Sequence, residues 1–131
     1  GKKCRPFVAP YDITLRKSRN DINIVQPDLM VICDLDEKLG EDGYYKGVPA
    51  LVLEILSGST MRKDSLKKMN LYMKAGIQEY WMVYPVDKII AIYQFENGKI
   101  IKVQSYEMED GEKAESFVFQ GLSIDMERVF R

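Results

Sequence analysis

The sequence predicts an α/β fold, in which a mixed β-sheet contains one crossover helix and a C-terminal β-hairpin. Two nearly continuous apolar runs, residues 27–33 and 48–56, have the composition of strands that are buried on both faces. A helical pattern follows the second run, and Asn97-Gly98 lies between two later strand-like segments, where it is a strong signal for a hairpin turn. Because the helix connects two apolar strands while the later strands pair antiparallel, the sheet is expected to be mixed.

The segments before the central strand alternate between extended and loop character. Residues 5–9 and 11–15 are expected to be short extended segments on either side of Pro10. Residues 34–47 are acidic and rich in glycine, a composition typical of a loop.

The helix and the elements after it carry clear boundary signals. Ser59 or Thr60 offers an N-cap, and the helix is expected to continue to Ala75, where Gly76 stops it. The remaining expected elements are strands at residues 79–84, 88–96, 99–106 and 117–119, and a terminal helical turn near residues 125–130.

The length suits one globular domain, residues 1–131. No apolar run approaches the roughly 20 residues that a helix needs to span a bilayer. Lys2, Lys3 and Arg5 lead into no long apolar stretch of the signal-peptide kind. A cytoplasmic location with no membrane contact is therefore expected.

The chain contains no histidine. This excludes Ser-His and Cys-His nucleophile pairs and most zinc chemistry, so an enzyme built from this chain would use carboxylates, lysine, arginine, tyrosine or hydroxyls. The net charge is −1, so the chain as a whole does not attract nucleic acid, although a local basic patch could still bind it.

The two cysteines, Cys4 and Cys33, lie far apart in the sequence and have no C-x-x-C partner. Cys33 ends an apolar run, which is typical of a buried thiol. Neither a zinc site nor a disulfide is expected.

Two carboxylates stand out against the apolar strands. Glu54 lies inside residues 48–56, where an unpaired carboxylate would cost several kcal/mol. It is either a strand-end residue paired with a nearby lysine or arginine, or part of a functional site. Asp28 opens the preceding strand directly after Pro27, where its alternative role is that of a turn residue accepting backbone hydrogen bonds.

One lysine of the helix is separated from the others. At about 100° per residue, Lys68 falls between Tyr72 and Ala75 in the less polar arc. Its side chain could extend along the edge of the core, pair with Asp64 one turn earlier, or face Glu54. The buried carboxylate on the strand that leads into this helix favours the last alternative.

Two carboxylates on neighbouring strands and an ammonium group on the next helix are suited to phosphodiester hydrolysis. Carboxylate oxygens bind Mg²⁺ or Mn²⁺, and such an ion polarises a phosphoryl oxygen and acidifies a bound water. The lysine can position that water or stabilise charge on the phosphate.

Several segments in this order are also those of a known family. They are Ala9-Pro10-Tyr11-Asp12, Val25-Gln26-Pro27-Asp28, Glu54-Ile55-Leu56-Ser57, Ser59-Thr60, Arg62, Asp64, Lys68, Tyr72, Gly76-Ile77-Gln78-Glu79-Tyr80-Trp81 and Gly121-Leu122-Ser123-Ile124-Asp125. With them the chain resembles the Uma-two family of bacterial proteins, which are predicted endonucleases of the PD-(D/E)XK, restriction-endonuclease-like superfamily. The resemblance spans almost the whole chain and implies that fold.

The resemblance also implies roles for individual residues. Asp28 and Glu54 would be metal ligands, with the backbone carbonyl of Ile55 as a further one. Leu56 stands where the superfamily pattern places its lysine, and Lys68 on the helix takes over that position. The implied cofactor is Mg²⁺ or Mn²⁺.

Two further points come from the resemblance. Tyr72 matches a recurring tyrosine of the family, with core packing as its alternative role. Family members usually carry an additional N-terminal region with an acidic residue near the active site, and this chain is expected to start after that region.

The leading hypothesis is a metal-dependent endonuclease with DNA as its substrate and Asp28, Glu54 and Lys68 as catalytic residues. The main alternative is a catalytically silent nuclease-like module that binds nucleic acid or a protein partner. A homodimer formed through the apolar hairpin is a third possibility. A glycosidase would also use two carboxylates, but no aromatic platform for a sugar is evident, so this reading ranks below the others.

Overall fold

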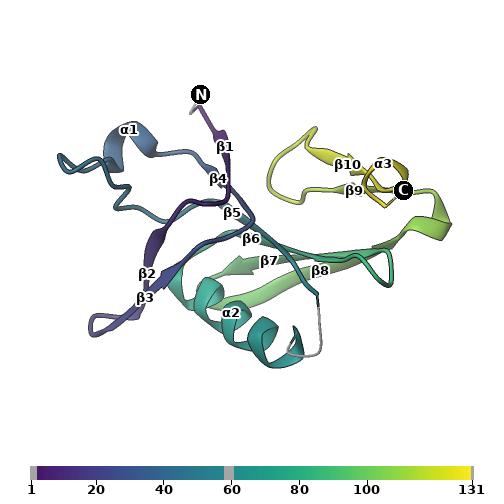
Figure 1. Cartoon of the computed structure of the whole chain (residues 1–131), viewed down its shortest axis with the longest axis horizontal. Coiled ribbons are helices and arrows are strands. Elements are labelled where there is room, and N and C mark those ends of the chain that lie inside the picture. Colours follow the sequence, from purple (N-terminus) through teal and green to yellow (C-terminus); the bar gives the residue numbers. More distant parts are fainter. Residues whose placement is uncertain (1–2, 58–60, 131) are drawn as a thin grey trace.

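The computed structural model describes residues 3–57 and 61–130, without the side chains of residues 61–64, and it contains a six-stranded sheet (Figure 1). In spatial order the strands are β1 (Arg5–Val8), β4 (Leu29–Ile32), β5 (Leu51–Ile55), β6 (Glu79–Tyr84), β7 (Ile89–Glu96) and β8 (Lys99–Glu107). Strands β5 and β6 are parallel, and the other neighbouring pairs are antiparallel. The expected mixed α/β sheet is therefore confirmed.

Helix α2 (Met61–Ala75) forms the crossover between the parallel strands β5 and β6. Gly76 follows it with a φ of 101°, a left-handed conformation that glycine adopts without strain, so the expected helix stop is confirmed. The expected N-cap residues, Ser59 and Thr60, lie outside the described residues. Within the described chain, no helix has both the length and the apolar character that a membrane span requires.

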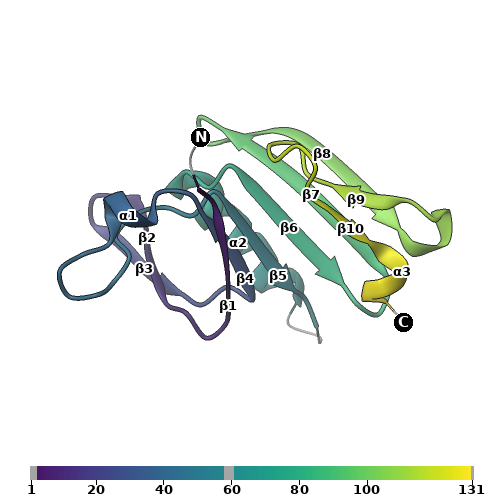
Figure 2. The ribbon, with the colours of Figure 1, turned by 90° about the horizontal axis from the view of Figure 1, so that it is seen from above.

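Both faces of the sheet are covered, which explains why its central strands are apolar (Figure 2). The covering elements are α2 and the hairpin of β2 (Ile13–Ser18) and β3 (Asp21–Val25) on one face, and β9 (Lys113–Glu115), β10 (Ser123–Asp125) and α3 (Met126–Val129) on the other. Along β6, Tyr80 and Met82 enter the core under α2, while Trp81 and Val83 enter the core under the C-terminal elements. The alternation of a strand therefore supplies two apolar cores at once.

The β7–β8 hairpin forms around Asn97-Gly98, as predicted. Glu96 pairs with Lys99, which leaves those two residues as the turn. Their φ values of 54° and 72° are the left-handed conformations of a type I′ turn.

Two elements of the N-terminal half were not predicted. Strand β3 has an alternating sequence, but its isoleucines, Ile22 and Ile24, are 54% and 70% exposed, so its apolar side does not face the core. Helix α1 (Leu35–Lys38) is a single turn within the expected loop at residues 34–47, and it contains no buried residue.

Residues 117–119 do not form the expected strand, and the prediction was wrong there. The backbone N–H groups of Phe117 and Val118 donate to Oε1 of Glu79 at 2.7 and 3.1 Å, and that of Phe119 donates to Oγ of Ser116 at 2.8 Å. These groups are thus taken up by side chains instead of a neighbouring strand. The strands of this region are β9 and β10, which pair antiparallel after a 3₁₀ turn, η1 (Met108–Asp110).

Cys4 and Cys33 form a disulfide, so the expectation of a buried thiol was wrong. The antiparallel pairing of β1 with β4 places Arg5 opposite Ile32, and the neighbouring cysteines then have their Cα atoms 4.0 Å apart. The sequence could not reveal this pair because it is created by the pairing of two strands far apart in the chain.

Glu79 anchors the C-terminal elements to the sheet. Its side chain is completely buried. Besides the two backbone N–H groups, its carboxylate accepts hydrogen bonds from Trp81 Nε1 at 2.9 Å and from Ser116 Oγ at 2.6 Å. Donors that surround a buried carboxylate in this way offset the cost of removing it from water.

We predict that Glu79→Gln lowers the free energy of unfolding by about 2 kcal/mol or more. An amide has only one acceptor oxygen, so its NH₂ group would face the Trp81 indole N–H or the backbone N–H groups, donor against donor. Urea unfolding followed by tryptophan fluorescence measures the change. Glu115→Gln, at an exposed position on β9, is the matched control. Equal stability of the two variants would contradict the anchoring role.

Candidate active site

Asp28 and Glu54 lie at the same end of two paired strands. Glu54 is in β5, and Asp28 comes directly before β4, which pairs antiparallel with β5 through Leu29 and Leu53. Oδ2 of Asp28 accepts a hydrogen bond of 2.7 Å from the backbone N–H of Ile55. The strand register therefore brings the two predicted carboxylates together, and Asp28 also has the turn-type backbone contact that was its alternative role.

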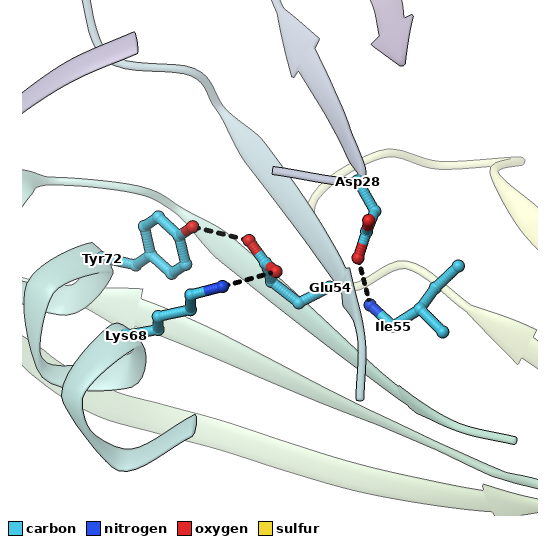
Figure 3. Close-up of polar contacts among 5 residues, drawn as sticks. All are labelled: Asp28, Glu54, Ile55, Lys68 and Tyr72. Atoms are coloured by element: carbon cyan, nitrogen blue, oxygen red, sulfur yellow. Dashed lines mark hydrogen bonds and ion pairs between the residues drawn. The ribbon is translucent and has the colours of Figure 1, made fainter. Parts of the chain in front are cut away.

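Helix α2 supplies two donors to Glu54 (Figure 3). Lys68 Nζ donates to Oε2 at 3.1 Å, and the hydroxyl of Tyr72 donates to Oε1 at 2.8 Å. The two donors are one helical turn apart, so they reach the carboxylate from the same face of the helix. Glu54 is only 4% exposed, while the side chain of Lys68 remains 39% exposed. The site is thus a buried anion held by a cation that solvent can reach.

The predicted contact between Lys68 and Glu54 is present in the structure. The side chain of Asp64, the alternative partner of Lys68, lies outside the described residues. The core-packing role of Tyr72 is confirmed, because the residue is fully buried in the core under α2, and its hydroxyl also contacts Glu54.

The family of the chain follows from a comparison with known protein families. A family model named Uma2 and described as a putative restriction endonuclease matches residues 2–127. The chain belongs to the Uma2 family. No match was found among curated proteins.

A solved structure supports the Uma2 fold of this chain. It is the crystal structure of a putative nuclease belonging to DUF820 from Anabaena variabilis ATCC 29413, with a TM-score of 0.72 and 19% sequence identity. The match covers 97% of this chain and 68% of the other. At this identity the likeness establishes the fold and not the residue roles.

The donor atoms of this Uma2 site suit a small divalent cation. Mg²⁺ commonly binds through one or two carboxylates and completes its shell with water and substrate oxygens. Asp28 and Glu54 provide two carboxylates, and within the described residues no larger cluster of metal-binding side chains is present. The amide of Ile55 is directed at Asp28, while the ligand role of its carbonyl stays a prediction.

Burial controls the protonation of the tyrosines around Glu54. It raises the pKa of the Tyr72 hydroxyl, and the negative charge of Glu54 and the hydrogen bond to it raise that pKa further. Tyr80 is fully buried, with its ring centroid 5.0 Å from that of Tyr72. Burial and the charge of Glu54 raise the pKa of Tyr80 as well. Both hydroxyls therefore stay protonated beside the carboxylate.

The sequence did not lead us to expect the hydrogen bond from Tyr72 to Glu54 or the position of Tyr80 beside Tyr72. The position of Tyr72, four residues after Lys68, was a usable signal because such residues share a helix face. Tyr80 gave no such signal, since it resembles any aromatic residue of a buried strand. Its hydroxyl has no hydrogen-bond partner among the described residues, which is uncommon for a buried polar atom.

We predict that the free energy of unfolding falls at high pH because of Tyr72 and Tyr80. Their pKa values are raised on folding, so the folded state holds these protons more tightly than the unfolded state. The resulting stabilisation is complete below the tyrosine pKa of the unfolded chain, about 10, and is lost progressively as the pH rises above it.

Urea unfolding between about pH 9 and about pH 11 tests this dependence. The Tyr72→Phe/Tyr80→Phe variant should lose stability less steeply with pH than the parent protein. Tyr44→Phe, at an exposed position, is the control and should keep the parent slope. Identical slopes for all three proteins would show that the buried hydroxyls do not control this loss.

Proposed function

We propose that this Uma2 protein is a metal-dependent endonuclease that hydrolyses phosphodiester bonds in DNA. The observation that carries the proposal is the buried Glu54 carboxylate, held by Lys68 and Tyr72 beside Asp28. Membership of a family described as putative restriction endonucleases supports it. The name of the structural relative, a putative nuclease, points to the same chemistry.

The energetics of the pair support a functional role. Removing the Glu54 carboxylate from water costs several kcal/mol, and its contact with the partly exposed ammonium group of Lys68 only partly offsets this. Apolar residues of similar volume often stabilise a fold equally well. The contact between Glu54 and Lys68 is therefore better explained by a role in chemistry than by a gain in stability.

Each residue of the site has a specific role in the proposed reaction. Asp28 and Glu54 would hold Mg²⁺ or Mn²⁺, with the carbonyl of Ile55 as a further ligand. The ion, when bound, supplies Lewis acidity to a phosphoryl oxygen and to a bound water. The ammonium group of Lys68 would orient the attacking water and offset negative charge that develops on the phosphate. Tyr72, through its hydrogen bond, would fix the orientation of Glu54.

We predict that Glu54→Gln and Lys68→Ala each lower the rate of DNA cleavage by about 100-fold or more. The first removes a charged metal ligand, and the second removes the cation that faces the phosphate. Cleavage of single- and double-stranded DNA with Mg²⁺ or Mn²⁺ measures the rate, and titration calorimetry measures metal affinity. Glu115→Gln serves as the control for the loss of one carboxylate at an exposed position.

The two variants separate metal binding from the chemistry of the lysine. Glu54→Gln should abolish divalent-metal binding, while Lys68→Ala should retain it, because the ammonium group is not a ligand. Metal affinity that survives Glu54→Gln would rule out the proposed metal site. Parent-like cleavage by Lys68→Ala would remove Lys68 from the mechanism.

A second candidate is a catalytically silent module that binds nucleic acid or a protein partner. It is favoured by the net charge of −1 and by the small number of carboxylates that the described residues bring together. A correctly folded parent chain that binds DNA but never cleaves it, with either metal, would favour this candidate over the endonuclease.

A further inference from the structure

A groove lies between α2 and the β2–β3 hairpin, which packs alongside the helix (Figure 1). Its volume is about 270 Å³, and it is lined by Lys17, Asn23, Lys67, Lys68, Asn70 and Leu71. The hairpin provides the first two residues and the helix provides the other four. The groove is thus formed by two separate elements that meet over one face of the sheet.

The groove concentrates positive charge, although the net charge of the chain is −1. Among the described residues that line it, three are lysines, two are asparagines and none is acidic. In the described part of the chain two carboxylates contact these groups. Glu54 accepts from Lys68 Nζ at 3.1 Å, and Asp21 lies 3.7 Å from Lys17 Nζ and accepts a 2.9 Å hydrogen bond from Asn23 Nδ2. An ion pair this long between partly exposed side chains is weak, so Lys17 can contact another anion.

Lys68 connects the groove to the candidate active site. Its ammonium group contacts Glu54 at 3.1 Å, and its side chain also forms part of the groove wall. An extended anion lying in the groove would therefore reach the candidate active site at Glu54 while it stays in contact with the lysines. A polynucleotide backbone has this form, with one negative charge on every phosphate.

We propose that this groove binds the phosphate backbone of the DNA strand, with Lys17 and Lys67 contacting phosphates next to the one at Glu54. The inference rests on the proposed function and adds the β2–β3 hairpin to the substrate surface. Lysine and asparagine side chains are common donors to phosphate oxygens, and such contacts position the nucleic acid without reading its sequence. Binding should consequently depend strongly on salt and weakly on sequence.

The test is the binding of a fluorescein-labelled DNA duplex to the full chain in EDTA, where cleavage does not interfere. Lys17→Ala/Lys67→Ala should bind about tenfold more weakly than the parent protein and lower the salt dependence of log K by about 2. The control is Lys99→Ala/Lys113→Ala, which removes the same charge from exposed positions on β8 and β9. It should retain most of the parent affinity and the parent salt dependence.

The outcomes separate this inference from the nuclease proposal. Equal weakening by both double variants, or no binding by the parent chain, would overturn the groove as a DNA site. If the parent cleaves DNA and Lys17→Ala/Lys67→Ala leaves its KM unchanged, the groove is wrong while the nuclease stands. If the parent protein binds DNA but never cleaves it, and only Lys17→Ala/Lys67→Ala loses this binding, the groove is supported and the nuclease is refuted.

Discussion

The arrangement of the candidate site depends on the contact between Glu54 and helix α2. A carboxylate inside an apolar strand needs donors that come from protein groups, because little water reaches it. The crossover helix supplies both of them, Lys68 and Tyr72, from one face. The length and direction of the helix after β5 therefore decide whether the central strand can carry this charge.

The two buried carboxylates of the sheet, Glu79 and Glu54, have different surroundings. Glu79, in β6, has both oxygens occupied by neutral donors and no cation in contact among the described residues. Glu54, on the neighbouring parallel strand, has one neutral donor and one partly exposed ammonium group. In the first arrangement all donors are neutral, whereas the second includes a cation that solvent can reach.

The sequence predicted those parts of the fold that depend on local patterns. The apolar runs, the stop at Gly76 and the Asn97-Gly98 turn each carry their own signal, and the helical position of Lys68 indicated its partner on β5. The disulfide, strand β3 and the segment at residues 117–119 could not be predicted in this way. The disulfide and residues 117–119 depend on groups distant in the chain, such as Glu79, which replaces a neighbouring strand as the hydrogen-bond acceptor. Strand β3 pairs with the adjacent β2, but its isoleucines are exposed.

The strand order has a consequence for the synthesis of the protein. From β4 to β8, each strand of the sheet pairs with the next one of that sheet to leave the ribosome. Asp28, Glu54 and the two groups that donate to Glu54, Lys68 and Tyr72, are therefore translated before Glu79 and the C-terminal elements. The strands that carry the candidate site are thus synthesised before β9, β10 and α3, which cover the opposite face of the sheet.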